Sequence, residues 1–107
     1  MQMNTISYEQ RVRTYTNAFA VYGETLQKIV AIEELSECQK EICKIIRGTG
    51  SFEHLAEEIA DATIMLEQLC LMFNINDEVC NEMDAKIARL DKRLSEASPR
   101  VFGSTGK

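Results

Sequence analysis

Two pairs of carboxylates, each pair spaced three residues apart, are the residues of this sequence best suited to chemistry. Glu34 and Glu37 lie in the run EELSE, and Glu58 and Asp61 lie in the run EEIAD. No other two of the 17 acidic residues have this spacing. Because residues three apart on a helix are surface neighbours, each pair is predicted to present two carboxylates side by side.

Carboxylates held close together favour a bound divalent cation. At an effective dielectric constant near 20, two negative charges about 4 Å apart repel by roughly 4 kcal/mol, and a cation removes that cost. A set of oxygen ligands suits Mg²⁺ or Mn²⁺ better than Zn²⁺, which recruits His or Cys. The bare motifs are equally compatible with solvated helix faces, since an exposed like-charge pair costs only about 0.2–0.5 kcal/mol.

The elements that must position these groups are four predicted helices, with no strand pattern anywhere in the chain, so the predicted fold class is all-α. Ser7, Ser51 and Asn76 are the predicted N-caps, because their side-chain oxygens can accept hydrogen bonds from the first turn. Gly23 and Gly48 are the predicted stops for the first two helices. The predicted helices cover residues 8–22, 24–47, 52–73 and 77–98.

The second and third helices should form an antiparallel pair, because the connection from Gly48 to Gly50 is very short. Glu37 lies 11 residues before Gly48, and Glu58 lies 8 after Gly50, so the two acidic motifs should lie at a similar level. Each acidic arc is predicted on the shoulder of an apolar stripe that faces the core. The predicted stripes are Ala31, Leu35, Cys38, Ile42 and Ile45, and Leu55, Ile59, Ala62, Leu66, Leu69 and Phe73.

Composition limits the class of protein. A chain of 107 residues with 45% hydrophobic residues and one proline predicts a single helical domain, here residues 1–98, followed by a disordered tail at 99–107. The net charge of −5 argues against a nucleic-acid partner. No apolar run reaches the length of a membrane span and no secretory signal is recognised, so a cytoplasmic location is expected. The four cysteines lack the spacing of a zinc site or a disulfide framework.

The acidic motifs in their apolar context resemble a known family. The run QKIVAIEELSECQKEI, followed by HLAEEIADATIMLEQL, is similar to the MazG-like, all-α nucleoside triphosphate pyrophosphohydrolases. The signature of that family is Glu-x-x-Glu and, one helix later, Glu-x-x-Asp. The resemblance covers roughly residues 23–94, with its parts in the right order on the predicted helices.

The resemblance implies a four-helix MazG-like core that assembles as a homodimer or homotetramer. It also implies Mg²⁺-dependent cleavage of a (deoxy)nucleoside triphosphate to the monophosphate and pyrophosphate. The metal ligands, and hence the catalytic residues, would be Glu34, Glu37, Glu58 and Asp61. An oligomer is expected on physical grounds as well, since the third helix carries apolar residues on most of its sides.

The fourth predicted helix offers cations for the substrate phosphates. In the family an Asn-x-Lys-Phe stretch followed by Arg has this role, and MDAKIARL places Lys86 and Arg89 at the matching positions. Asp84 and Ile87 replace the family's Asn and Phe, which puts the sugar or phosphate contact in question. Cations near the end of a helix also need no functional reason, because they complement the helix dipole.

Three further residues are weaker candidates. Gln27 shares an arc with Glu34 and is a candidate substrate contact. Glu41 extends the acidic arc, either as a further ligand or, as we favour, as a solvated neighbour. His54, the single histidine, is placed one turn before Glu58 and is expected to be structural. The rival to the enzyme hypothesis is a non-enzymatic helical interaction or adaptor protein in which the acidic arcs are hydrated.

Overall fold

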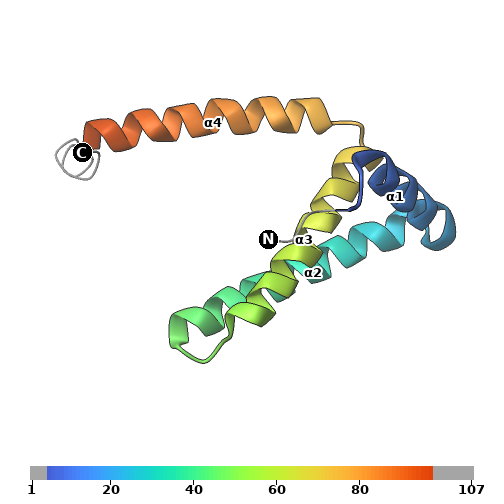
Figure 1. The fold of residues 1–107 in the computed structure, drawn as a ribbon, viewed down its shortest axis with the longest axis horizontal. Coiled ribbons are helices and arrows are strands. Elements are labelled where there is room, and N and C mark those ends of the chain that lie inside the picture. The colour runs from blue at the N-terminus through green and yellow to red at the C-terminus, as the bar shows by residue number, and fades with distance from the viewer. Residues whose placement is uncertain (1–4, 98–107) are drawn as a thin grey trace. The chain divides into compact units, whose positions relative to one another are not determined.

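The structure, a computed structural model, describes residues 5–97 and is all-α with four helices in that range (Figure 1). This confirms the predicted fold class and number of helices. The predicted tail at 99–107 lies outside the described residues. The helices are α1 (Tyr8–Tyr22), α2 (Glu24–Arg47), α3 (Phe52–Met72) and α4 (Asn76–Ala97).

Side-chain caps begin two of the helices as predicted. The Ser7 hydroxyl accepts a hydrogen bond of 3.0 Å from the backbone N–H of Gln10, and the Ser51 hydroxyl accepts one of 3.1 Å from that of His54. Each bond satisfies a backbone donor that the first turn leaves free. Asn76 is the first residue of α4 and not its cap, since the Val79 N–H donates to the carbonyl oxygen of Ile75.

Glycines make the two sharp breaks on either side of α2. Gly23 has φ 87° and Gly48 has φ 80°, a region that side chains with a Cβ atom rarely adopt. At Gly50 the constraint is space, because a Cβ atom there would lie 3.0 Å from Cβ of Lys44. The connection between α2 and α3 therefore depends on two glycines for two different reasons.

Helices α2 and α3 lie side by side and antiparallel (Figure 1). Among their buried and half-buried residues, one set on each helix recurs at alternating spacings of three and four, the pattern of a coiled-coil contact. We call this contact the α2–α3 seam. It consists of Gln27, Ala31, Glu34, Cys38, Glu41 and Ile45 on α2, and Leu55, Glu58, Ala62, Met65, Leu69 and Met72 on α3.

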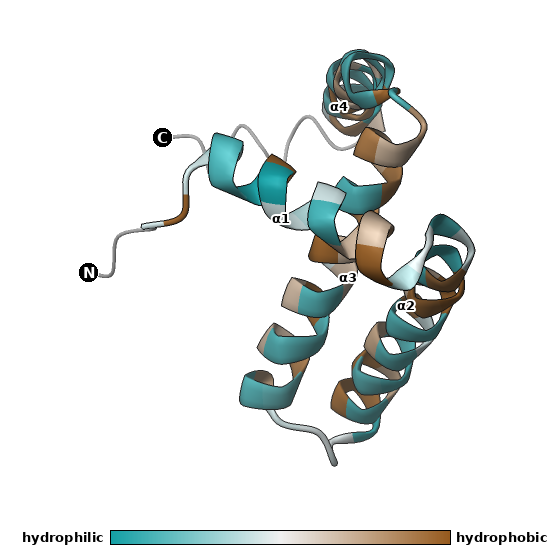
Figure 2. Ribbon diagram, turned by 90° about the vertical axis from the view of Figure 1, so that its right-hand side faces the viewer, coloured by the Kyte–Doolittle hydropathy of each residue, from teal (hydrophilic) through white to brown (hydrophobic). Residues whose placement is uncertain are grey.

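The seam corrects the predicted position of the acidic residues. Glu34 and Glu58 lie in the seam itself, whereas the prediction placed them on its shoulder. Because these acidic residues occupy the seam, part of the predicted apolar stripes is exposed to solvent. Figure 2 shows hydrophilic and hydrophobic segments alternating along both helices. We call the exposed large apolar residues, each one position after a seam residue, the apolar flank: Ile32, Leu35, Ile42 and Ile46 on α2, and Ile59, Leu66 and Phe73 on α3.

Helix α1 completes the first compact unit, which ends at Asn74. Its Tyr15 is buried, as are the apolar residues Ala31, Ala62 and Met65. The second unit begins at Ile75 and contains α4. On α4 the apolar residues Met83, Ile87, Leu90 and Leu94 recur at spacings of three and four and are exposed. Among residues 5–97, no helix has the length and apolar character needed to cross a membrane.

Candidate metal centre

Three of the four predicted ligands converge where α2 and α3 pack together. Glu34, Glu58 and Asp61 each offer a carboxylate oxygen, and these oxygens all lie within 4.8 Å of one another. Glu34 comes from α2, and the other two come from successive turns of α3. The antiparallel pairing thus brings together residues that lie more than 20 positions apart in the sequence.

The electrostatic environment makes it harder to keep this cluster ionised. Partial burial, followed by the charges of Asp61 and Glu37, raises the pKa of Glu34 above its ordinary value. The pKa of Glu58 is raised as well, first by burial and then by Asp61 and Glu34. Both shifts have the sign expected for carboxylates that share a site without a compensating cation.

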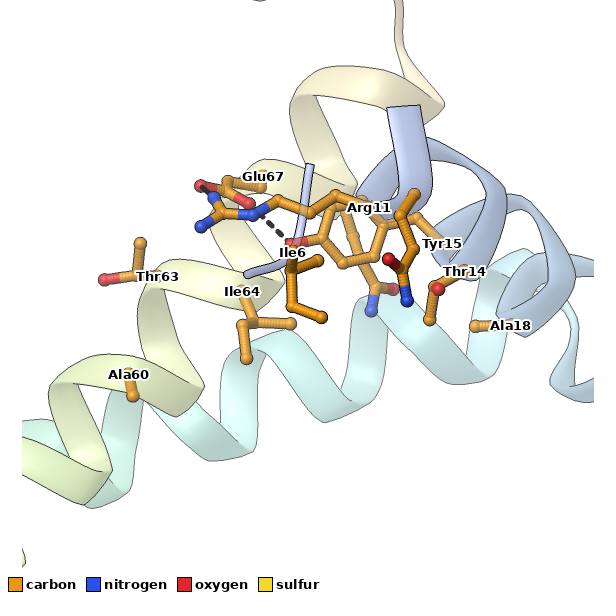
Figure 3. A pocket seen from close by; sticks show the side chains of 11 residues that line it. Ile6, Arg11, Thr14, Tyr15, Ala18, Ala60, Thr63, Ile64 and Glu67 are labelled. Carbon is orange, nitrogen blue, oxygen red and sulfur yellow. Dashed lines mark hydrogen bonds and ion pairs between the residues drawn. The ribbon is translucent and has the colours of Figure 1, made fainter. Parts of the chain in front are cut away.

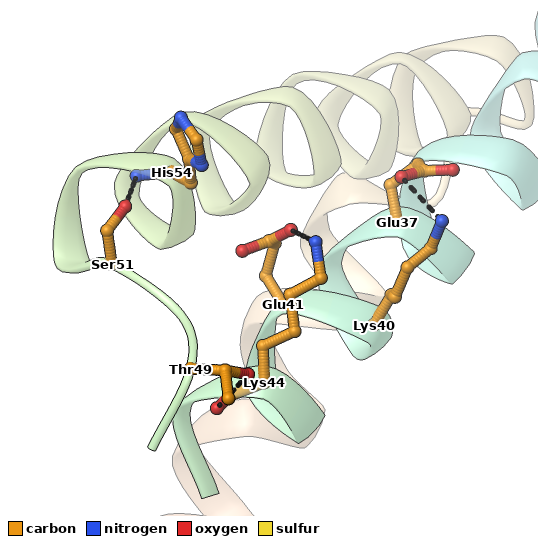
Figure 4. A network of polar contacts seen from close by, with 7 residues as sticks. All are labelled: Glu37, Lys40, Glu41, Lys44, Thr49, Ser51 and His54. Atoms are coloured by element: carbon orange, nitrogen blue, oxygen red, sulfur yellow. Dashed lines mark hydrogen bonds and ion pairs between the residues drawn. The ribbon is translucent and has the colours of Figure 1, made fainter. Parts of the chain in front are cut away.

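Glu37 differs from the other three predicted ligands. Its side chain is exposed, and one of its oxygens lies 3.8 Å from Nζ of Lys40 on the same helix (Figure 4). The structure does not bring it into the group of oxygens within 4.8 Å. Its charge still contributes to the raised pKa of both Glu34 and Glu58, so it lies close to the cluster.

Glu41 is buried, which corrects the expectation of a solvated neighbour. Its residue is 7% exposed, and it is a member of the seam two turns after Glu34. One carboxylate oxygen accepts a hydrogen bond of 3.2 Å from Nζ of Lys44 (Figure 4). Its charge adds to those that raise the pKa of Glu58. The negative charge of this region therefore extends along the seam beyond the predicted motifs.

Two oxygens of these carboxylates have no partner among the described residues. They are Oε1 of Glu41 and Oε1 of Glu58, and both are buried. An ionised oxygen without a hydrogen bond is costly inside a protein, because it has lost its contact with water. The donor set, entirely carboxylate, is the one that Mg²⁺ and Mn²⁺ prefer. The residues present therefore fit a hard divalent cation.

The weaker candidates on the hairpin differ in environment. Gln27 is buried, at 7% exposure, in the seam two turns before Glu34. His54 is exposed, and its backbone N–H donates to the Ser51 cap at the start of α3 (Figure 4). The structural role expected of His54 is consistent with this position.

Lys86 and Arg89 both lie on α4, in the second unit, and are exposed. The Lys86 ammonium lies 3.8 Å from a carboxylate oxygen of Glu82, one turn earlier. Asp84, at the position where the family has Asn, is exposed on the same helix. Their predicted contact with substrate phosphates stays a prediction.

Sequence reasoning missed a polar cluster between α1 and α3. The Tyr15 hydroxyl donates to Oε1 of Glu67 at 2.5 Å, and the Arg11 guanidinium donates to Oε2 of the same carboxylate at 2.9 Å (Figure 3). Burial, with Glu67 adding to it, raises the pKa of Tyr15 to about 12. A helical pattern shows which residues share a face of α1, but not which residue of α3 they meet.

Comparisons with protein-family models, with curated proteins and with solved structures find no match to this chain. The resemblance to the MazG-like family thus rests on the motifs alone.

Proposed function

We propose that the protein is a Mg²⁺-dependent nucleoside triphosphate pyrophosphohydrolase that converts a (d)NTP to the monophosphate and pyrophosphate. The observation that supports this most is the convergence of Glu34, Glu58 and Asp61, whose oxygens lie within 4.8 Å of one another across two helices. The unpartnered oxygen of Glu58 and the raised pKa of Glu34 and Glu58 add to it.

The chemistry follows from the charges. When bound, Mg²⁺ or Mn²⁺ neutralises phosphate charge and makes a coordinated water easier to deprotonate. Glu34, Glu58 and Asp61 would hold the metal, and Glu37, whose charge already acts on Glu34 and Glu58, would be a further ligand. An acidic protein can bind a triphosphate in this way, because the cation lies between two sets of negative oxygens.

The decisive experiment is a screen of canonical and modified nucleoside triphosphates with Mg²⁺, with pyrophosphate and orthophosphate measured separately. We expect pyrophosphate from at least one substrate and none after chelation by EDTA. Orthophosphate as the product would place the cleavage at another bond. A screen without any product would contradict the hydrolase proposal.

A matched pair of variants tests the ligand assignment. Glu58→Gln keeps the size of the side chain and removes the charge, and we expect kcat to fall by at least about 100-fold. Mutation of a residue that only hydrogen-bonds to a metal ligand already lowers metal affinity or activity by about 10–100-fold. Glu57→Gln is the control, because Glu57 is the neighbouring, exposed carboxylate on α3. Equal activity of both variants would show that the ligands are assigned wrongly.

The apolar flank supports a second candidate function, a helical interaction protein. Its residues on α2 and α3 are 41–79% exposed, far more than a packed core leaves. Residues one position after the seam on two antiparallel helices lie on the same side of the pair, so the apolar flank forms one surface. An adaptor would use this surface without metal chemistry.

Self-association of a hydrolase would use the same surface. We propose that the apolar flank pairs with a second copy of the chain, giving the homodimer or homotetramer that the resemblance implies. The two candidate functions differ in their dependence on metal. An adaptor would show neither release of pyrophosphate nor stabilisation by Mg²⁺.

A further inference from the structure

A pocket of about 630 Å³ lies between α1 and α3, outside the candidate metal centre (Figure 3). Small-molecule sites commonly have volumes of about 300–1,000 Å³ and are mostly apolar with a few polar groups. The walls of this pocket follow that description. Ile6 and Ala18 line one side, and Ala60 and Ile64 line the other.

Gln68 is a buried polar residue of the pocket whose side-chain oxygen lacks a partner among the described residues. Its residue is only 6% exposed, yet its Oε1 accepts no hydrogen bond from any described residue. A buried carbonyl oxygen without a donor costs about 1–3 kcal/mol. This oxygen has less than 1 Å² of exposed surface, so a ligand in the pocket reaches it only after the Gln68 amide rotates, and a ligand N–H would then remove that cost.

The charged groups of the pocket are already paired with one another. Glu67 accepts hydrogen bonds from both Tyr15 and Arg11, so one carboxylate and one guanidinium neutralise each other. A charged ligand would have to compete with this pair. The part of a ligand that enters the pocket should therefore be uncharged and largely apolar.

The pocket and the metal centre lie along the same helix. Gln68 follows Asp61 by seven residues, which is two turns of α3 on the same face, or about 10 Å along the axis. Ala60, a pocket residue, is the direct neighbour of Asp61. One molecule with a charged end and an uncharged, flat end can thus occupy both places.

We infer that this pocket binds the nucleobase of the substrate, with Oε1 of Gln68 accepting a hydrogen bond from a base N–H. The inference rests on the proposed function, since it assigns the phosphates of the same molecule to the carboxylate cluster. Gln68 is then a residue that determines base preference, and the pair formed by Arg11 and Glu67 keeps charged groups out of the pocket.

Nucleosides test the pocket without phosphate or metal. We would titrate the four deoxynucleosides and deoxyuridine, at millimolar concentration and without metal, into the ¹⁵N-labelled protein. We expect shifts of backbone amide signals at residues such as Ala18 and Ile64 for at least one nucleoside. The absence of such shifts for every nucleoside would overturn the inference, whether or not pyrophosphate is released from the triphosphates.

Three variants refine the test. Gln68→Leu keeps the volume and removes the unpaired oxygen, so it should fold, and the dissociation constant of the preferred nucleoside should rise at least tenfold. Ala18→Leu fills the pocket and should weaken binding of every nucleoside. Gln39→Leu is the control, because Gln39 is an exposed glutamine of α2 outside the pocket.

Kinetics separate this inference from the proposed function. If the protein releases pyrophosphate, Gln68→Leu should change the ratio of KM values between nucleotides of different bases, which a merely structural role would not do. Unchanged KM ratios would overturn the role of Gln68 and leave the hydrolase intact. Nucleoside binding without any pyrophosphate release would support the pocket and contradict the hydrolase.

Discussion

Glu34 and Glu58 face each other across the α2–α3 seam, with carboxylate oxygens within 4.8 Å of one another. A coiled-coil contact normally has apolar residues at such positions, because they are shielded from water. Two carboxylates there oppose folding unless a cation or a proton neutralises them. The dependence of stability on protonation of the carboxylates and on cation binding can be measured without knowledge of the substrate.

Magnesium should stabilise the fold. At a free Mg²⁺ concentration 100 times the dissociation constant, mass action adds about 2.7 kcal/mol, which raises the melting temperature by roughly 10 °C for a domain of this size. Differential scanning fluorimetry with MgCl₂, MnCl₂ and NaCl at matched ionic strength measures this. Glu58→Gln should lose most of the gain and Glu57→Gln should keep it. Equal stabilisation by NaCl would indicate screening of charge and no metal site.

Without metal, the stability of the fold should fall as the pH rises above about 4.5, the ordinary pKa of these carboxyl groups. Because the pKa of Glu34 and of Glu58 is raised in the folded state, the native protein binds more protons than the unfolded chain. Their contribution is fully present below pH 4.5 and is lost as the pH passes the raised pKa values. Urea unfolding between pH 4 and 8 measures it.

The variant Glu34→Gln provides the control for this pH dependence, since it removes one of the two titrating groups. Its unfolding free energy should decline less steeply over the same range. Saturating Mg²⁺ should reverse the slope in the unaltered protein, because a carboxylate must lose its proton to bind a metal. A slope that is the same in both proteins would exclude Glu34 as a contributor.

The buried carboxylate of Glu41 should depend on Lys44. Lys44→Met removes the cation that lies 3.2 Å from Glu41 and leaves a buried charge unpaired, so we expect a loss of about 1–3 kcal/mol in the free energy of unfolding. Lys40→Met is the matched control, because Lys40 and its partner Glu37 are both exposed, and such pairs contribute below about 1 kcal/mol. Similar losses in both variants would show that burial of Glu41 has no energetic effect.

The apolar flank should mediate self-association. Leu66→Glu places a charge in the middle of this surface, where Leu66 is 46% exposed, and we expect it to convert a dimer or tetramer to a monomer. Ile29→Glu is the control, since Ile29 is similarly exposed, at 47%, but lies outside the apolar flank. Sedimentation velocity at micromolar concentration distinguishes the two. A monomeric unaltered protein would contradict the oligomer prediction directly.

The bounds of the helices could be predicted because local chemistry determines them. Ser7 and Ser51 cap with their own side chains, and Gly23 and Gly48 adopt backbone angles that few other residues tolerate. The short turn also made the antiparallel pairing of α2 and α3 predictable, and with it the similar level of the acidic motifs.

The depth of the carboxylates could not be predicted in the same way. The predicted stripe on α2 and the seam have the same alternating spacing of three and four and share Ala31, Cys38 and Ile45, but the stripe contains Leu35 and Ile42 where the seam contains Glu34 and Glu41. Adjacent residues lie about 100° apart on a helix, and a pattern based on apolar residues favours Leu35 and Ile42 over their acidic neighbours. The position of Gln68 at the pocket could be seen only in the structure, since the pocket depends on how α1 packs against α3.

The geometry of a site built from two helices depends on the length and conformation of the turn that joins them. Gly48 adopts φ 80° and Gly50 has no room for a side chain, so the turn has little freedom to adopt another length. One residue inserted there and absorbed at the start of α3 would rotate its side chains by about 100° and move them by about 1.5 Å. Asp61 and Glu58 would then point away from Glu34. The centre is therefore more sensitive to insertion in the turn, far from any carboxylate, than to many substitutions beside it.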